Sequence, residues 1–276
     1  MKYLPKGFRG AAIAAGLKST GALDLTIIEN LGPRFDAAAV YTSNKVVAAP
    51  VIWSREVTKG KLVRAAVLNS GGANACTGPQ GFADTHETAE KVGELLGVSS
   101  GEVVVCSTGL IGELLPMPKI LAGLELIAAK LKTDSLDDVS RAIMTTDSVP
   151  KVATVSISGV EFAGIAKGAG MLAPALATML SVVMTDAVLP ENAQEIFSQV
   201  ADRTYNRIDS DGCTSTNDTV LLMSSGASGV TLSEEDLRTA LFYVADSLAR
   251  QLIADAEGHS KIISITTVNA KSERDA

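Results

Sequence analysis

The stretch at positions 167–181, KGAGMLAPALATMLS, decides the fold, because it can be interpreted in two incompatible ways. Residues 168–173 fit a G-x-G-x-x-A loop, which joins a strand to a helix and holds the phosphates of a dinucleotide. The same small residues also lead to the Ala177-Thr178 peptide bond. In that second interpretation Thr178 is either a nucleophile or an ordinary core threonine.

The composition indicates a compact globular protein that forms one large or two modest domains. The chain has 276 residues, of which 46% are hydrophobic and 20% are charged, values typical of folded rather than disordered chains. Aromatic residues make up only 4%. We therefore expect a core built mainly from Ala, Val, Leu and Ile.

Charge and cysteine content favour a cytoplasmic protein with small-molecule substrates. The net charge is −7 and no run of basic residues occurs, which argues against nucleic-acid binding. No segment approaches the ~20 uninterrupted apolar residues of a membrane span. Cys76, Cys106 and Cys213 lack C-x-x-C spacing, which fits buried thiols in a reducing compartment. His86 and His259 are too few for a multi-histidine metal site, so no metal is expected.

Short apolar runs rich in β-branched residues alternate with helical patterns, which predicts an α/β fold without internal repeats. The predicted strands are 23–28, 37–42, 62–68, 103–106, 152–157, 180–184, 220–223 and 262–267. The predicted helices are 82–96, 118–131, 136–144 and 193–205, with a further helix that begins at Ser233 and ends near Gly258. Ser233 and Asp236 fit a capping signature for this last helix.

Four loops at strand ends carry polar residues at unusual density. They are NSGGANACTG (69–78), CSTGLIG (106–112), MTTD (144–147) and DSDGCTSTNDT (209–219). In α/β proteins ligands bind in such loops, although the same residue types are also what turns require. In CSTGLIG, the Thr108 hydroxyl and the Gly109 N–H could stabilise an oxyanion.

The two interpretations of the 167–181 stretch differ in what surrounds them. A dinucleotide loop gains support from Asp186, an acidic residue a little under ~20 residues further on. Against it, Pro174 falls in the first turn of the helix that such a loop requires, and no repeating βαβ framework flanks the loop. A nucleophile needs a base, and the chain has two histidines and no G-x-S-x-G motif. Cleavage before Thr178 would supply one, because a free α-amino group has a pKa near ~8.

Several segments resemble the ornithine acetyltransferase family, also called bifunctional glutamate N-acetyltransferase/amino-acid acetyltransferase, of arginine biosynthesis. Besides KGAGMLAPALATML, they are PKGFRGAAIAAGLK, NSGGANACTG, CSTGLIGELLPM, AIMTTD, DGCTSTNDTVLL and DAEGHSK, in family order across nearly the whole chain. The resemblance implies a mixed-sheet α/β sandwich of the DmpA-like type, which resembles N-terminal nucleophile hydrolases but is distinct from them.

The resemblance implies self-cleavage at Ala177-Thr178 into an alpha-chain segment, 1–177, and a beta-chain segment, 178–276. Both would contribute to one catalytic unit, and the expected assembly is a heterotetramer of two alpha and two beta chains. Thr178 would take the acetyl group from N-acetylornithine and pass it to glutamate. No cofactor is expected, although some members also use acetyl-CoA as a donor.

The family's oxyanion donors fall on Thr108 and Gly109, and its substrate contacts fall on Thr145, Lys167, Thr178 and Glu257. Family members are longer than this chain, and their further C-terminal part carries additional substrate contacts. Two alternatives therefore stay open at this point. One is a dinucleotide-dependent oxidoreductase that uses the Gly168/Gly170 loop, and the other is an inactive truncated fragment or scaffold whose 262–267 strand lacks a partner.

Overall fold

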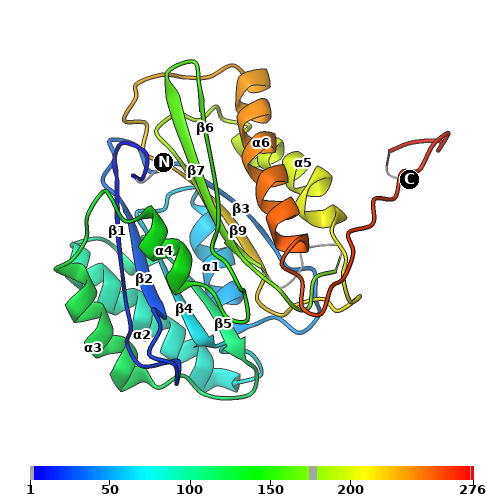
Figure 1. Cartoon of the computed structure of the whole chain (residues 1–276). Coiled ribbons are helices and arrows are strands. Elements are labelled where there is room, and N and C mark those ends of the chain that lie inside the picture. Colours follow the sequence, from blue (N-terminus) through cyan, green and yellow to red (C-terminus); the bar gives the residue numbers. More distant parts are fainter. Residues whose placement is uncertain (1–2, 174–178, 274) are drawn as a thin grey trace.

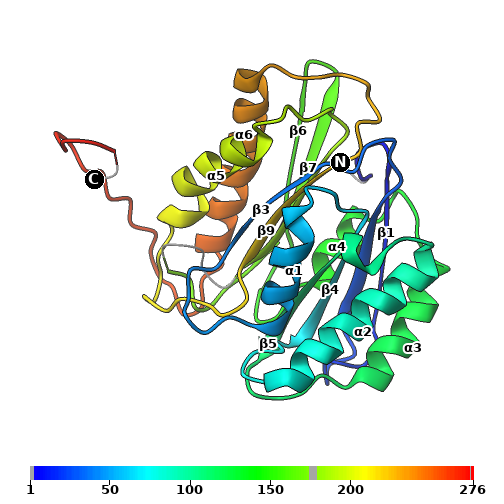
Figure 2. The same cartoon turned by 180° about the vertical axis from the view of Figure 1, so that it is seen from behind.

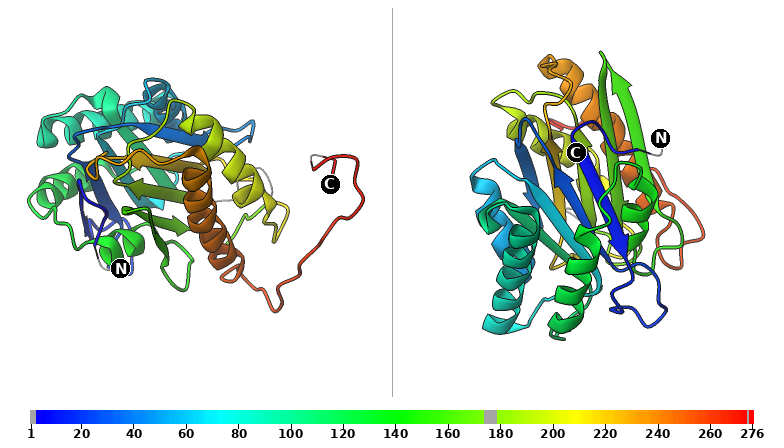
Figure 3. Two further views of the ribbon diagram at one scale, coloured as in Figure 1. Left: turned by 90° about the horizontal axis from the view of Figure 1, so that it is seen from above. Right: turned by 90° about the vertical axis from the view of Figure 1, so that its left-hand side faces the viewer.

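The computed structural model describes residues 3–173, 179–273, 275 and 276. Two β-sheets pack face to face, and helices cover the outer face of each sheet (Figures 1 and 3). Both sheets are mixed, because each contains one parallel pair of strands among antiparallel ones. The predicted mixed-sheet α/β sandwich is therefore confirmed.

The first sheet has the strand order β1-β2-β4-β5. Its strands are β1 (Phe8–Ile13), β2 (Leu25–Asn30), β4 (Ala65–Gly72) and β5 (Val103–Leu110), and β4 and β5 are parallel. Helices α2 (Gly78–Leu96) and α3 (Met117–Ala128) cover its outer face (Figure 2). Helix α1 (Ala49–Lys59) lies along β5, and the Ser54 hydroxyl both donates to the carbonyl of Val105 and accepts from its N–H. This contact satisfies backbone groups that an edge strand would otherwise leave open.

The second sheet has the strand order β3-β9-β8-β7-β6. Its strands are β3 (Ala37–Tyr41), β6 (Lys151–Ile157), β7 (Val160–Lys167), β8 (Leu180–Thr185) and β9 (Thr219–Ser224). Helices α5 (Ala193–Arg203) and α6 (Glu234–Ile253) cover its outer face, and α4 (Leu136–Ala142) packs against β1, β2 and β7. The 3₁₀ segments Ser100–Glu102 and Tyr205–Arg207 complete the regular structure of the described residues.

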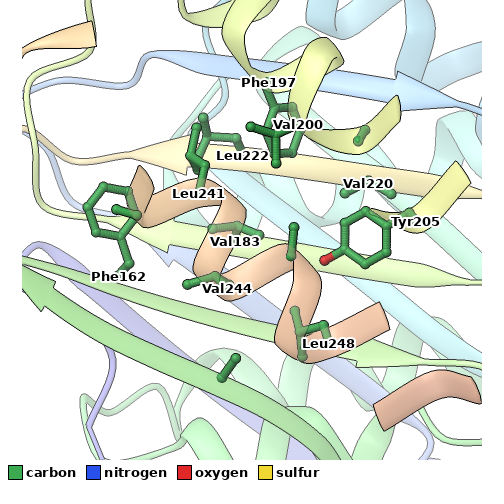
Figure 4. Close-up of a cluster of buried hydrophobic side chains, with 14 of the residues drawn as sticks. Phe162, Val183, Phe197, Val200, Tyr205, Val220, Leu222, Leu241, Val244 and Leu248 are labelled. Carbon is green, nitrogen blue, oxygen red and sulfur yellow. The ribbon is translucent and has the colours of Figure 1, made fainter. Parts of the chain in front are cut away.

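The central strands are apolar on both faces because each face meets another layer. Every residue of β8 and of β9 is buried. Val183 and Leu222 point toward α5 and α6, whereas Val182 and Leu221 point toward the first sheet. Figure 4 shows the outer of these two cores, where the strands meet helical side chains that include Phe197, Leu241, Val244 and Leu248. This double burial explains the near-continuous apolar runs in the sequence.

Most of the predicted elements are confirmed, with boundaries shifted by a few residues. Helix α6 begins as predicted, because the Ser233 hydroxyl accepts a hydrogen bond from the N–H of Asp236. The predicted strands do not include β1 or β7, and the predicted helices do not include α1.

The predicted strand at 262–267 was wrong. Residues 262–267 have no regular structure, and Ile263 and Ile265 are 79% and 88% exposed. The segment leads away from the sheets after α6 (Figure 1). A β-branched run forms a strand only where a neighbouring strand offers backbone partners, and none of the described strands pairs with this one.

Two further expectations concern the surface. Cys106 is buried, whereas Cys76 and Cys213 are exposed, so the prediction of buried thiols holds for one of the three. None of the helices in the described part of the chain combines the length and the apolar character needed to cross a bilayer.

Candidate active site

The end of β5 places Thr108 and Gly109 beside the end of β4. Gly109 pairs with Gly71 of β4 in parallel register, and its φ of +134° is one that side chains rarely allow. A Cβ added to Gly109 would lie 2.5 Å from the carbonyl carbon of Gly71. The glycine is therefore required both by its backbone angle and by the close approach of the neighbouring strand.

Lys167 reaches this point from the second sheet. It is the last residue of β7, it is buried, and its Nζ donates a hydrogen bond to Oγ1 of Thr108 over 3.1 Å. Burial lowers the pKa of Lys167 to about 8, although the charge of Asp147 opposes this effect. A buried cation thus lies directly against the predicted oxyanion site.

A buried ionic network holds the neighbouring backbone in place. Nζ of Lys151 lies 2.6 Å from Oδ1 of Asp147 and 2.6 Å from Oδ2 of Asp255. The carboxylate of Asp147 accepts hydrogen bonds from the N–H groups of Thr145, over 2.9 Å, and Gly168, over 2.7 Å. Burial raises the pKa of Asp147, but the charges of Lys167 and Lys151 outweigh burial and hold it below its usual value. The network fixes the backbone at two positions that border the site.

Five of the predicted site residues line one cavity of about 710 Å³. They are Thr108, Gly109, Thr145, Lys167 and Glu257. Glu257 is exposed, and its N–H donates to the carbonyl of Ala169 over 2.8 Å. A Cβ added to Gly170 would lie 3.1 Å from Cδ of Glu257, so this carboxylate packs against the glycine loop. The cavity combines a buried cation with an anion at its mouth, and the role of each residue stays a prediction.

Ala177 and Thr178, the predicted cleavage site and nucleophile, lie outside the described residues. The described chain resumes at Met179, whose N–H donates to Oδ1 of Asp218 over 3.0 Å. Met179 directly precedes β8, which is paired with β7 along its length from Phe162–Thr185 to Lys167–Leu180.

The prediction missed several other residues of the cavity wall. Lys18 lines the cavity, and Oδ2 of Asp24 accepts from its N–H and from that of Leu17, which fixes the loop. Asp211 also lines the cavity and accepts from the N–H of Met171 over 2.6 Å. Lys18 and Asp211 both lie in segments that sequence analysis singled out, PKGFRGAAIAAGLK and DSDGCTSTNDT. Their place at the cavity could be found only from the packing of distant loops.

The dinucleotide interpretation is not supported. A phosphate-binding glycine loop joins a strand to a helix within a βαβ unit, whose strands are parallel. The strands on either side of the Gly168/Gly170 loop, β7 and β8, are antiparallel neighbours. Asp186, the candidate ribose ligand, is buried at the end of β8, where its Oδ1 accepts from the N–H of Glu161.

Comparison with known proteins gives one consistent result. The model of the ArgJ family matches residues 9–276. The chain is 55% identical to the arginine biosynthesis bifunctional protein ArgJ of Streptomyces coelicolor over 272 residues, which are 98% of this chain and 71% of that protein. It is 45% identical to the structure of ornithine acetyltransferase complexed with ornithine from Mycobacterium tuberculosis, with a TM-score of 0.56, over 64% of this chain and 94% of the other.

A more distant likeness concerns the fold alone. The L-aminopeptidase D-Ala-esterase/amidase of Ochrobactrum anthropi, a variant of the Ntn hydrolase fold, has a TM-score of 0.55 at 11% identity and covers 93% of this chain and 86% of the other. This likeness agrees with the fold described above. Since the family model matches residues 9–276, and a relative is 55% identical over 98% of this chain, the chain belongs to the ArgJ family.

Proposed function

We propose that this protein is a glutamate N-acetyltransferase (ornithine acetyltransferase) of arginine biosynthesis, which moves an acetyl group from N-acetylornithine to glutamate. Membership of the ArgJ family and the similarity to an ornithine acetyltransferase support this assignment. The observation that carries this assignment is the cavity, where Lys167 contacts Thr108 of the other sheet and which Glu257 also lines. Both substrates are amino acids with a carboxylate and further polar groups, and a cation and an anion in one cavity suit such ligands.

The proposed acetyl transfer consists of two successive acyl-transfer steps. In the first, the hydroxyl of Thr178 attacks the acetyl carbonyl, and its α-amino group accepts the hydroxyl proton. The N–H of Gly109 and the hydroxyl of Thr108 stabilise the oxyanion, and the proton passes to the departing nitrogen of ornithine. In the second, the amino group of glutamate attacks the acetyl ester and regenerates Thr178. An ester intermediate replaces one difficult transfer by two easier ones.

Lys167 and Glu257 have complementary roles in this scheme. The ammonium group of Lys167 binds the substrate carboxylate, and its contact with Thr108 orients the hydroxyl that faces the oxyanion. Glu257 binds an ammonium group of the substrate, and Thr145 donates a further hydrogen bond from the wall that Asp147 holds. The scheme uses no cofactor, and acetyl-CoA is a second candidate donor.

The amino group of Thr178 becomes free by self-cleavage at Ala177-Thr178. The resulting segments, 1–177 and 178–276, share the second sheet, since β3, β6 and β7 come from the first segment and β8 and β9 from the second. Strand β9 lies between β3 and β8, so neither segment can complete this sheet alone. The shared sheet supports a single catalytic unit, for which we propose the heterotetramer of two alpha and two beta chains and a cytoplasmic location.

Intact mass spectrometry after incubation with N-acetylornithine tests the proposal. The expected result is an acetyl adduct confined to a fragment that begins at Thr178, and its removal when glutamate is added. The variant Thr178→Ala should show neither cleavage nor adduct. A single uncut chain that transfers acetyl groups would contradict the self-cleavage scheme, and a cut chain that never carries acetyl would contradict the transferase assignment.

A further inference from the structure

Lys18 is a second cation of the cavity that the scheme above does not use. It lines the same cavity of about 710 Å³ as Lys167, and it is half-buried. Burial lowers the pKa of Lys167 most strongly, and the nearby charge of Lys18 lowers it further. Two ammonium groups that repel each other therefore share one cavity. A ligand with two negative charges would relieve this repulsion.

The loop that carries Lys18 is anchored beside the end of β4. Asp24 is fully buried, and its carboxylate accepts hydrogen bonds from the N–H groups of Leu17 and Lys18 over 2.6 and 3.1 Å. The loop also touches β4, because a Cβ added to Gly71 would lie 2.9 Å from the carbonyl oxygen of Leu17. Gly71 is the strand partner of Gly109. A fixed backbone thus places Lys18 next to the pair of strand ends that carries the proposed oxyanion site.

Both lysines keep hydrogen-bond donors for a ligand. In the described part of the chain, the ammonium group of Lys18 donates to the carbonyl of Leu23 over 2.7 Å, and that of Lys167 donates to the hydroxyl of Thr108. Neither lysine forms an ion pair there, whereas Lys151 pairs with two carboxylates. An ammonium group has three N–H donors, of which each contact uses one. Partly desolvated cations of this kind suit carboxylate ligands.

The two substrates of the proposed reaction differ in their number of carboxylates. N-acetylornithine has one and glutamate has two. In the scheme above, Lys167 binds the carboxylate that both substrates have in common. We propose that Lys18 binds the side-chain carboxylate of glutamate and thereby selects glutamate as the acetyl acceptor. This inference rests on the proposed function and deepens it, because it names a residue that serves only the second transfer.

The test compares Lys18→Met with Lys119→Met in the full chain. Methionine is also an unbranched side chain, but it has no charge. Lys119 is a matched control, because its ammonium group also donates to a carbonyl of this loop, that of Gly16, over 2.8 Å. It is exposed and does not line the cavity. Steady-state kinetics is measured with N-acetylornithine as donor and with either glutamate or glutamine as acceptor, since glutamine has the same shape and a neutral side chain.

The two half-reactions report on Lys18 separately. We expect Lys18→Met to lower kcat/KM for glutamate about 10- to 100-fold and to leave kcat/KM for N-acetylornithine unchanged. The preference for glutamate over glutamine, taken as the ratio of their kcat/KM values, should fall by a similar factor. Lys119→Met should match the wild type. A role in shaping the loop alone would weaken both acceptors alike, and an unchanged ratio in Lys18→Met would overturn the proposal.

A second variant covers the case in which Lys18→Met does not fold. Lys18→Gln still offers an N–H to the carbonyl of Leu23 but carries no charge. The same loss of preference for glutamate over glutamine is expected. A folded Lys18→Gln chain that keeps the wild-type preference overturns the proposal.

Binding of glutarate separates failure of this inference from failure of the proposed function. Glutarate has two carboxylates and no amino group to accept acetyl, so isothermal titration calorimetry measures its binding without turnover. The wild-type chain should bind glutarate more tightly than its monoamide, and Lys18→Met should lose this difference; equal Kd values in the wild type would overturn the role of Lys18. If the wild-type chain transfers acetyl to no acceptor, the proposed function fails, and the glutarate comparison still decides whether Lys18 binds a second carboxylate.

Discussion

Replacing Lys167 with methionine should stabilise the folded protein at neutral pH while it weakens substrate binding. Lys167 is fully buried, and burial lowers its pKa from 10.5 to about 8. This difference corresponds to about 3 kcal/mol, since each pKa unit equals ~1.4 kcal/mol. A charged Lys167 in the cavity therefore destabilises the folded protein by roughly that amount. A buried lysine with so strongly lowered a pKa is typical of a functional site.

The sign of the pH dependence follows from the lowered pKa. Below about pH 8 the lysine is charged in the folded and unfolded states, and the full cost is present. Between about pH 8 and 10.5 the folded state releases the proton while the unfolded state keeps it, so wild-type stability gains about 3 kcal/mol from this group. A methionine at this position would not titrate. The stability advantage of Lys167→Met should thus shrink by about 3 kcal/mol across this range.

Urea denaturation at several pH values measures this difference. Both proteins should carry Thr178→Ala, so that each is a single chain and unfolding is not coupled to dissociation. Lys59→Met is the control, because Lys59 is exposed at the end of α1 and pairs with exposed Glu56. A stability difference between Lys167→Met and wild type that stays constant from about pH 7 to 10.5 would refute the reasoning. With Thr178 restored, Lys167→Met should raise KM roughly 10- to 100-fold, from ~1.5–3 kcal/mol for a lost charge-assisted hydrogen bond.

Two further predictions concern the ends of the strands. Gly109→Ala should lower kcat about tenfold or more, because the added Cβ would meet the Gly71 backbone and shift the N–H proposed to bind the oxyanion. Steady-state kinetics measures this change, and an unchanged kcat would contradict the proposed role of Gly109. After cleavage, the segments 1–177 and 178–276 should elute together in gel filtration and separate only in denaturant, because β3/β9 and β7/β8 join them; two separate peaks in native buffer would contradict the shared sheet.

The layered fold could be predicted from sequence where burial leaves a clear pattern. The strands β8 and β9 are buried on both faces, which gives short continuous runs of Val, Leu and Met, and α6 has both a capping serine and an apolar stripe. Helix α1 left no such pattern, since its segment APVIWSREVTK is rich in β-branched residues. Its contacts with β5, such as those of Ser54, set its conformation, and they depend on residues about fifty positions away.

Part of the candidate site could also be predicted from the sequence, through family motifs rather than through patterns of burial. Thr108, Thr145, Lys167 and Glu257 were identified through family motifs, and the structure brings them to one cavity. No local pattern reveals that Asp147 and Lys151 support this cavity. Lys151 also pairs with Asp255, and that contact depends on how β6 packs beside the end of α6. The run at 262–267 shows the opposite error, in which strand-forming residues occur where no described strand pairs with them.

The topology of the second sheet predicts that the chain would stay folded after the proposed cleavage. Strands β7 and β8 are neighbours in the sheet, and their backbones remain paired from Phe162–Thr185 to Lys167–Leu180 whether or not the connection between them is continuous. Cleavage at Ala177-Thr178 would remove one covalent link and leave every one of these strand pairs in place. The same connection begins at Lys167, which contacts Thr108, and ends at Met179, which Asp218 binds. The described residues on either side of this connection are therefore anchored by side chains of other strands and loops, independently of the connection itself.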